Sequence, residues 1–128
     1  MKNILKNKNV LVTGATGGLG KEFCYQLADY GVNLCITSKT ESKLLSLQNK
    51  LSSKGVKCVA KSADFTLGID NLDDCFDKVD VLINCAGVYI EKSLDNLNDN
   101  DYEEIFDVNL KTPFKLIKEV STNMKKNR

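Results

Sequence analysis

Apolar residues follow two different periods that take turns along the whole chain, and this alternation limits the fold more than any other feature. Consecutive or alternating apolar residues predict strands at 10–12, 32–36, 56–60 and 81–83. Apolar residues at helical spacing predict helices at 19–30, 40–51, 69–79 and 99–124, with Pro113 either kinking or restarting the last one. A strand–helix order that repeats in this way predicts an α/β fold with a parallel sheet and right-handed crossovers.

The order of the elements is that of half a doubly wound, Rossmann-type sheet, truncated after the fourth strand and the fourth helix. In such a sheet, ligands bind beyond the carboxyl ends of the strands, where the strand order reverses. We expect a single domain over residues 1–128. Because no fifth strand is predicted, the run 81–83 is expected to form an open apolar edge, so that the isolated chain is marginally stable or associates.

The composition excludes several kinds of partner and site. Eighteen Lys and Arg residues against seventeen Asp and Glu leave a net charge of +1, which favours neither nucleic acid nor an anionic membrane. The chain has no histidine, so imidazole metal sites and histidine catalysis are excluded, and we expect no metal. No apolar run approaches the ~20 residues of a membrane helix. None of the five cysteines forms a C-x-x-C pair, so we expect reduced, buried thiols in a cytoplasmic protein.

A glycine-rich segment joins the first predicted strand to the first predicted helix, and Thr13–Gly20 reads T-G-A-T-G-G-L-G. Glycines let the backbone approach a pyrophosphate, and a helix N-terminus offers unpaired N–H groups with a partial positive charge. Neither the Walker pattern nor G-x-G-x-x-G fits, because Glu22 follows Lys21 and Thr16 occupies the second glycine position. The segment therefore predicts a phosphate site made by the backbone, with a plain tight turn as the alternative.

The spacing T-G-x-x-x-G-x-G resembles the glycine motif of the classical short-chain dehydrogenase/reductase family, at Thr13, Gly14, Gly18 and Gly20. Through Gly17 the segment also satisfies T-G-x-x-G-x-x-G, the pattern of the extended, sugar-nucleotide-modifying branch. Three later matches favour the classical branch: N-C-A-G at 84–87, an acidic residue at 64 and V-N-L at 108–110. The resemblance runs from Asn9 onward. It implies the N-terminal, cofactor-binding half of an enzyme similar to the 3-oxoacyl-acyl-carrier-protein reductases.

By that resemblance, a set of loop residues binds the nicotinamide cofactor: Thr13, Gly14, Thr16, Gly18, Leu19, Gly20, Ser38, Lys39, Asp64, Phe65, Asn84, Cys85, Ala86 and Gly87. Lys39 takes the place of the NADP-selecting arginine of the family, so NADP is the expected cofactor and NAD the second option. Asp64 matches the acidic residue that contacts the adenine. Cys85 stands where the family's N-N-A-G segment has its second asparagine, so a backbone contact to the cofactor is kept and the side-chain hydrogen bond is lost. Asn109 matches the catalytic asparagine, which anchors a proton-relay water.

The resemblance implies an NADP(H)-dependent oxidoreductase that moves hydride to or from a small carbonyl or alcohol substrate. The family uses a tyrosine with a lysine four residues later, and no tyrosine of this sequence has that lysine: Tyr25, Tyr30, Tyr89 and Tyr102. We therefore expect the chain alone to be inactive, as a truncated or split gene product, a fragment or a stand-alone module. The alternative function is a non-catalytic nucleotide-binding or interaction module. The helix at 99–125 is expected to join homo-oligomers, unless a complementary C-terminal half exists.

Overall fold

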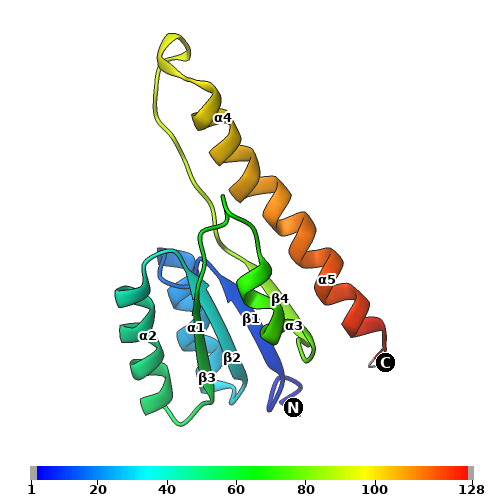
Figure 1. Cartoon of the computed structure of the whole chain (residues 1–128). Helices are drawn as coiled ribbons and strands as arrows, with labels where there is room; N and C mark the ends of the chain where they lie inside the picture. Colours follow the sequence, from blue (N-terminus) through cyan, green and yellow to red (C-terminus); the bar gives the residue numbers. More distant parts are fainter. Residues whose placement is uncertain (1–2, 127–128) are drawn as a thin grey trace.

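The computed structural model describes residues 3–126, so the ends of the predicted domain, 1–2 and 127–128, lie outside the described residues (Figure 1). Residues 3–126 form one sheet of four parallel strands. The strands are β1 (Asn9–Thr13), β2 (Asn33–Ser38), β3 (Cys58–Ser62) and β4 (Val81–Asn84). Their order is β3-β2-β1-β4, so β4 is an edge strand, as predicted. The four strands fall where the apolar runs predicted them.

Helices cover both faces of the sheet. Their bounds are α1 (Gly18–Asp29), α2 (Glu41–Ser53), α3 (Asp73–Phe76), α4 (Asp99–Phe106) and α5 (Thr112–Lys126). Figure 1 shows α1 and α2 on one face and α3 and α5 on the other. Two buried clusters match this division: Val10 and Val12 of β1 pack with α1 and α2, whereas Leu11 packs with α3 and α5. A strand that is apolar on both faces is what a three-layer α/β fold requires.

The first two helices end where the sequence predicted. Gly31 and Gly55 follow them with φ of +69° and +84°, a left-handed conformation that glycine adopts without a steric cost. Thr40 occupies the N-cap of α2, as predicted, but its side chain makes no capping hydrogen bond.

The predicted helix 99–124 has three parts. After α4, residues Asp107–Lys111 form a π-helical turn (η3), and α5 begins at Thr112. Pro113 is the second residue of α5, where a missing N–H is tolerated, and the wider turn precedes it. The helical segments from Asp99 to Lys126 are contiguous, so Pro113 does not interrupt them, and α4 and α5 follow one line in Figure 1.

The short helix predicted at 69–79 forms over part of that range. Only a 3-10 turn at Asp70–Leu72 (η1) and the four-residue α3 form there. The chain must leave the helix to enter β4, because the N–H of Asp80 donates to the carbonyl of Asn9. The Asp80 carboxylate also accepts from the Asn9 N–H at 2.8 Å.

The cysteine prediction is wrong for one pair. Cys24 is a buried free thiol, and Cys58 and Cys85 are half-buried free thiols. Cys35 of β2 and Cys75 of α3 form a disulfide, with their Cα atoms 6.6 Å apart. The two are separated by 40 residues in the sequence, so local spacing carried no signal of the pair. Within residues 3–126, no helix has the length and apolarity needed to cross a membrane.

Candidate functional site

The carboxyl ends of β1, β2 and β4 open into one cleft of about 250 Å³. The loop after β1 leads to α1 on one face, and the loop after β4 leads to α4 and α5 on the other. The two loops therefore diverge between neighbouring strands, which is the place where doubly wound sheets bind ligands. Most of the predicted loop residues line this cleft: Gly14, Thr16, Ser38, Lys39, Phe65, Cys85, Ala86 and Gly87.

Thr13 fastens the glycine segment to the end of β4. Its buried hydroxyl oxygen accepts hydrogen bonds from the N–H groups of Cys85 and Ala86, at 3.2 Å and 3.1 Å. Gly14 follows with φ of +60°, and a Cβ there would lie 2.6 Å from the Ala86 nitrogen. The two loops thus touch through their backbones, and only glycine fits at position 14.

Gly20 and Gly18 are glycines for different reasons. A Cβ on Gly20 would lie 2.8 Å from the carbonyl carbon of Gly14 and 3.0 Å from the Cα of Ala15, so the internal packing excludes a side chain. A Cβ on Gly18 would meet nothing within 4 Å, and Gly18 is not among the residues with positive φ. Neither packing nor backbone conformation therefore requires glycine at position 18.

The N-terminus of α1 is open to an anion. Its N-cap is Gly17, which makes no side-chain capping bond, and no acidic residue stands in the first turn. The first N–H groups of a helix carry a partial positive charge and need a partner. Together with the free space at Gly18, this end of α1 fits the pyrophosphate of a dinucleotide.

Ser38 and Lys39, the residues expected to recognise the 2′-phosphate, each pair with another predicted site residue. The Lys39 ammonium lies 3.0 Å from the Asp64 carboxylate. Thr16 donates its hydroxyl to the hydroxyl oxygen of Ser38 at 3.0 Å. Hydrogen bonds from Thr66 and then Lys39 hold the pKa of Asp64 below its usual value, and the hydrogen bond with Asp64 raises the pKa of Lys39. Both groups of the ion pair are therefore charged at neutral pH.

Asn109 bridges the loop that follows β4. Its amide nitrogen donates to the Val88 carbonyl at 2.8 Å, and its amide oxygen accepts from the Val88 N–H at 2.8 Å. Asn109 stands on the π-helical turn η3, a distortion that is frequent at functional sites. A Cβ on Gly87 would lie 3.4 Å from the Asn109 amide oxygen, so the two segments are in close contact. This one side chain therefore fixes the β4 loop to the C-terminal helix.

Some predicted residues do not line the cleft: Thr13, Gly18, Leu19, Gly20, Asp64, Asn84 and Asn109. Thr13 and Gly20 are buried in the packing of the loop, and the Leu19 side chain is 75% exposed. Asp64 turns toward Lys39 and Thr66. The prediction missed other lining residues: Gly17, Thr40, Ala63, Val88 and Val108. Each is one or two residues from a predicted one, so extending the motifs along the chain would have found them.

Among residues 3–126, no group of three or more acidic or cysteine side chains is placed to bind a metal ion.

Comparison with known proteins places these features in a family context. The sequence profile of the short chain dehydrogenase family matches residues 8–128. The 3-oxoacyl-(acyl-carrier-protein) reductase FabG of Staphylococcus epidermidis is 31% identical over 129 residues, which cover 95% of this chain and 53% of the reductase. The uncharacterized oxidoreductase YvaG of Bacillus subtilis is 29% identical over 97% of this chain and 48% of its own length. The chain thus spans about half the length of the curated relatives it matches.

Solved structures show the same fold. A blue fluorescent protein from a metagenomic library, in complex with NADPH, superposes with a TM-score of 0.87 at 27% identity, over 96% of this chain and 53% of that protein. The L-sorbose reductase of Gluconobacter frateurii, complexed with NADPH and L-sorbose, superposes with a TM-score of 0.90 at 18% identity, over 99% and 51%. At this identity the second likeness shows the fold alone.

Proposed function

The chain belongs to the short-chain dehydrogenase family, and on that premise we propose that it is the cofactor-binding half of an NADP(H)-dependent oxidoreductase. The observation that carries the proposal is the open N-terminus of α1, where Gly18 leaves free space beside uncapped N–H groups. A bound phosphate would accept hydrogen bonds from these N–H groups, whereas the packing of the fold does not require them to lack a partner.

The described residues divide the binding of a dinucleotide among three loops. The turn at Gly17 and Gly18 would hold the pyrophosphate with backbone N–H groups. Lys39 and Ser38 would hold a 2′-phosphate. Phe65 and the 85–87 loop would flank the rest of the cofactor. When bound, the nicotinamide supplies or accepts the hydride.

A preference for NADP rests on Lys39 and on the absence of a carboxylate at 37 and 38. In the structure the Lys39 ammonium is paired with Asp64, so a 2′-phosphate would have to compete with the Asp64 carboxylate for it. That one relative of 27% identity is solved with NADPH supports the choice. NAD is the second option, because one lysine is a less selective partner than a bidentate arginine.

We propose that the chain binds cofactor without turning over substrate. The 128 residues contain no tyrosine with a lysine four positions later, so the acid/base pair must come from polypeptide outside them. Asn109 would then be the one residue of the catalytic set in this half, and its two bonds to Val88 would place its amide beside the β4 loop. The alternative is a nucleotide-binding module with no catalytic partner. Cytoplasmic location stays a prediction from the sequence.

The C-terminal helix offers the surface for that partner. Five apolar side chains form its outer face: Tyr102, Phe106, Leu110, Phe114 and Ile117. Leu110 and Phe114 are 61% and 65% exposed, whereas Leu116 and Val120 on the inner side are buried. A helix that is apolar on both sides is typical of an interface. We propose that the outer face joins a second copy of the chain or a complementary C-terminal half.

Titration of the purified chain with NADPH and NADH, followed by fluorescence, tests the proposal. We expect saturable binding with tighter NADPH, and no oxidation of NADPH with a panel of carbonyl compounds. Lys39→Ala should weaken NADPH about tenfold and leave NADH unchanged, since it removes one charge-assisted contact. Lys57→Ala, just before β3 at the other end of the sheet, is the matched control. A folded chain that binds neither nucleotide would overturn the proposal.

The outer face is tested separately by chromatography and light scattering. Leu110→Lys should shift the chain from a dimer or larger species to a folded monomer, because the Leu110 side chain is 61% exposed on the single chain. A wild-type chain that is monomeric at high concentration would leave only the complementary half as the partner.

A further inference from the structure

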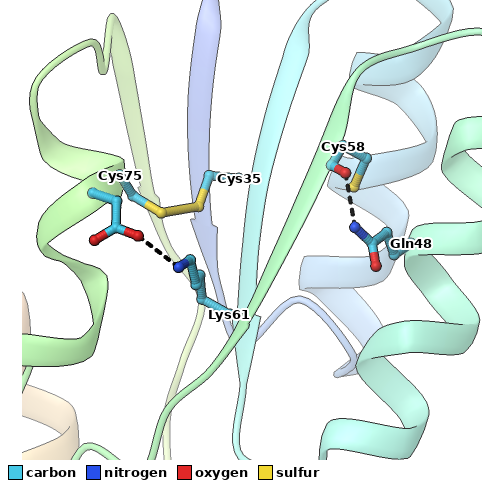
Figure 2. Close-up of a disulfide and its surroundings, with 6 residues drawn as sticks. Cys35, Gln48, Cys58, Lys61 and Cys75 are labelled. Carbon is cyan, nitrogen blue, oxygen red and sulfur yellow. Dashed lines mark hydrogen bonds and ion pairs between the residues drawn. A yellow bond between two sulfur atoms is a disulfide. The ribbon is translucent and has the colours of Figure 1, made fainter.

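Two links hold the four-residue helix α3 against the face of the sheet. Cys75 is joined to Cys35 of β2 by the disulfide, and the neighbouring Asp74 accepts a hydrogen bond from Lys61 of β3 at 2.7 Å. Figure 2 shows both links side by side on the same side of the strands, away from Cys58 and α2. The ion pair is largely exposed on its Asp74 side, so it holds α3 only weakly. The disulfide is therefore the stronger of the two links.

The geometry of the backbone suits this pair. The Cα atoms of Cys35 and Cys75 are 6.6 Å apart, inside the range that disulfides span. Both residues are half-buried, and they line a cleft of about 370 Å³ on the surface. An oxidant or a thiol reductant can therefore reach the sulfurs without unfolding the chain.

The other three cysteines are expected to react less readily with an oxidant. Burial raises the pKa of Cys24 to about 12 and that of Cys58 to about 11. Burial also raises the pKa of Cys85. Because the thiolate is the reactive form, a raised pKa lowers the reactivity of these three side chains at neutral pH. Oxidation is thereby directed to the Cys35–Cys75 pair.

We propose that Cys35 and Cys75 form a reversible oxidation site that fastens α3 to the sheet. Hydrogen peroxide closes it: one thiolate attacks the peroxide and becomes a sulfenic acid, releasing hydroxide that takes up a proton to give water. The second thiol then attacks the sulfenic sulfur, and a second water leaves as the sulfur–sulfur bond forms. A dithiol reductant opens it by exchange, which returns two protons and two electrons to the pair. In the reducing compartment that the sequence predicts, a surface-accessible disulfide is typical of a redox-sensing site. The proposal does not depend on nucleotide binding.

The test uses the wild-type chain. The protein is reduced, freed of reductant, treated with hydrogen peroxide, alkylated in denaturant and digested. We expect alkylation to fall from five cysteines to three, a peptide joining Cys35 to Cys75, and a return to five after dithiothreitol. The oxidised chain should melt on the order of 10 °C higher than the reduced one, because the link closes a long loop in the unfolded chain.

Two variants separate the pair from general oxidation. Cys75→Ser should lose both the joined peptide and the difference in melting temperature, whereas Cys58→Ser should keep both. Five alkylated cysteines after peroxide would overturn the proposal, and so would a link between other cysteines or between two chains. A link without any change in melting temperature would show that it does not fasten α3. The wild-type peptide map decides the pairing even if Cys75→Ser fails to fold.

Discussion

The contrast between Gly18 and Gly20 gives the sharpest test of the site. Both glycines belong to the first turn of α1, and both match the family motif. Alanine at position 20 would place its Cβ 2.8 Å from the carbonyl carbon of Gly14, well inside the 3.5–4.0 Å of an ordinary contact. The neighbour is backbone, whose carbonyl oxygen accepts a hydrogen bond from the Gly17 N–H at 3.0 Å, and it cannot move as a side chain could. We expect Gly20→Ala to cost about 3 kcal/mol of unfolding free energy, or roughly 10 °C in melting temperature.

Gly18→Ala should behave in the opposite way. The added methyl meets no protein atom within 4 Å, and alanine is the better helix former, so stability should stay unchanged or rise by up to ~1 kcal/mol. The same methyl would occupy the space that we assign to the pyrophosphate. Loss of one charge-assisted hydrogen bond there corresponds to a ten- to hundredfold weaker NADPH affinity, as an order of magnitude.

Urea denaturation and NADPH titration at one fixed salt concentration measure the two effects independently. The expected pattern is a stable Gly18→Ala with weakened NADPH binding and an unstable Gly20→Ala. Wild-type NADPH affinity in Gly18→Ala would refute the assignment of the phosphate to this turn. A loss of more than 2 kcal/mol in Gly18→Ala would refute the structural reasoning, since that residue would then be packed.

Three further outcomes follow from single side chains. Asn109→Ala removes both bonds to Val88 and should destabilise the chain by about 1–3 kcal/mol, which urea denaturation measures. Thr37→Val should raise stability by about 1 kcal/mol, because the Thr37 hydroxyl is buried without a hydrogen-bond partner among the described residues. The hydrogen bond from Lys92 lowers the pKa of Asp101 below its ordinary value of 3.8, so the stability that this carboxylate adds is present above about pH 4 and lost as the pH falls through the lower folded value. The melting temperature of wild type should therefore exceed that of Asp101→Asn at pH 7, and the gap should close below pH 4; a gap that widens in acid would contradict the assignment.

Local patterns were enough to predict the sheet. Each strand is a short apolar run between turn residues, and β1 is buried on both faces because Val10, Leu11 and Val12 are all apolar. The position of the glycine segment could also be predicted, because a motif that joins a strand to the following helix lies at the carboxyl edge of a parallel sheet. These features depend on residues that are near one another in the sequence.

The features that the sequence did not reveal depend on distant residues. The apolar spacing at 69–79 indicated a short helix, but not that the pairing of Asp80 with Asn9 ends it before residue 79. Lys39 and Asp64 looked like two independent ligand contacts, and only the adjacent ends of β2 and β3 show that they reach each other. Such contacts require the three-dimensional register, which periodicity does not encode.

The place of β1 in the sheet has a consequence for how the chain folds during synthesis. On one side, β1 pairs with β2, whose Asn33 is 24 residues beyond Asn9. On the other side it pairs with β4, and the N–H groups that donate to the Thr13 hydroxyl lie 72 and 73 residues further along the chain. A growing chain can therefore complete one flank of its central strand long before the other flank exists. Until residue 84 is available, β1 is a temporary edge, and a ribosome-bound chain that stops short of it exposes an unpaired apolar strand to its neighbours.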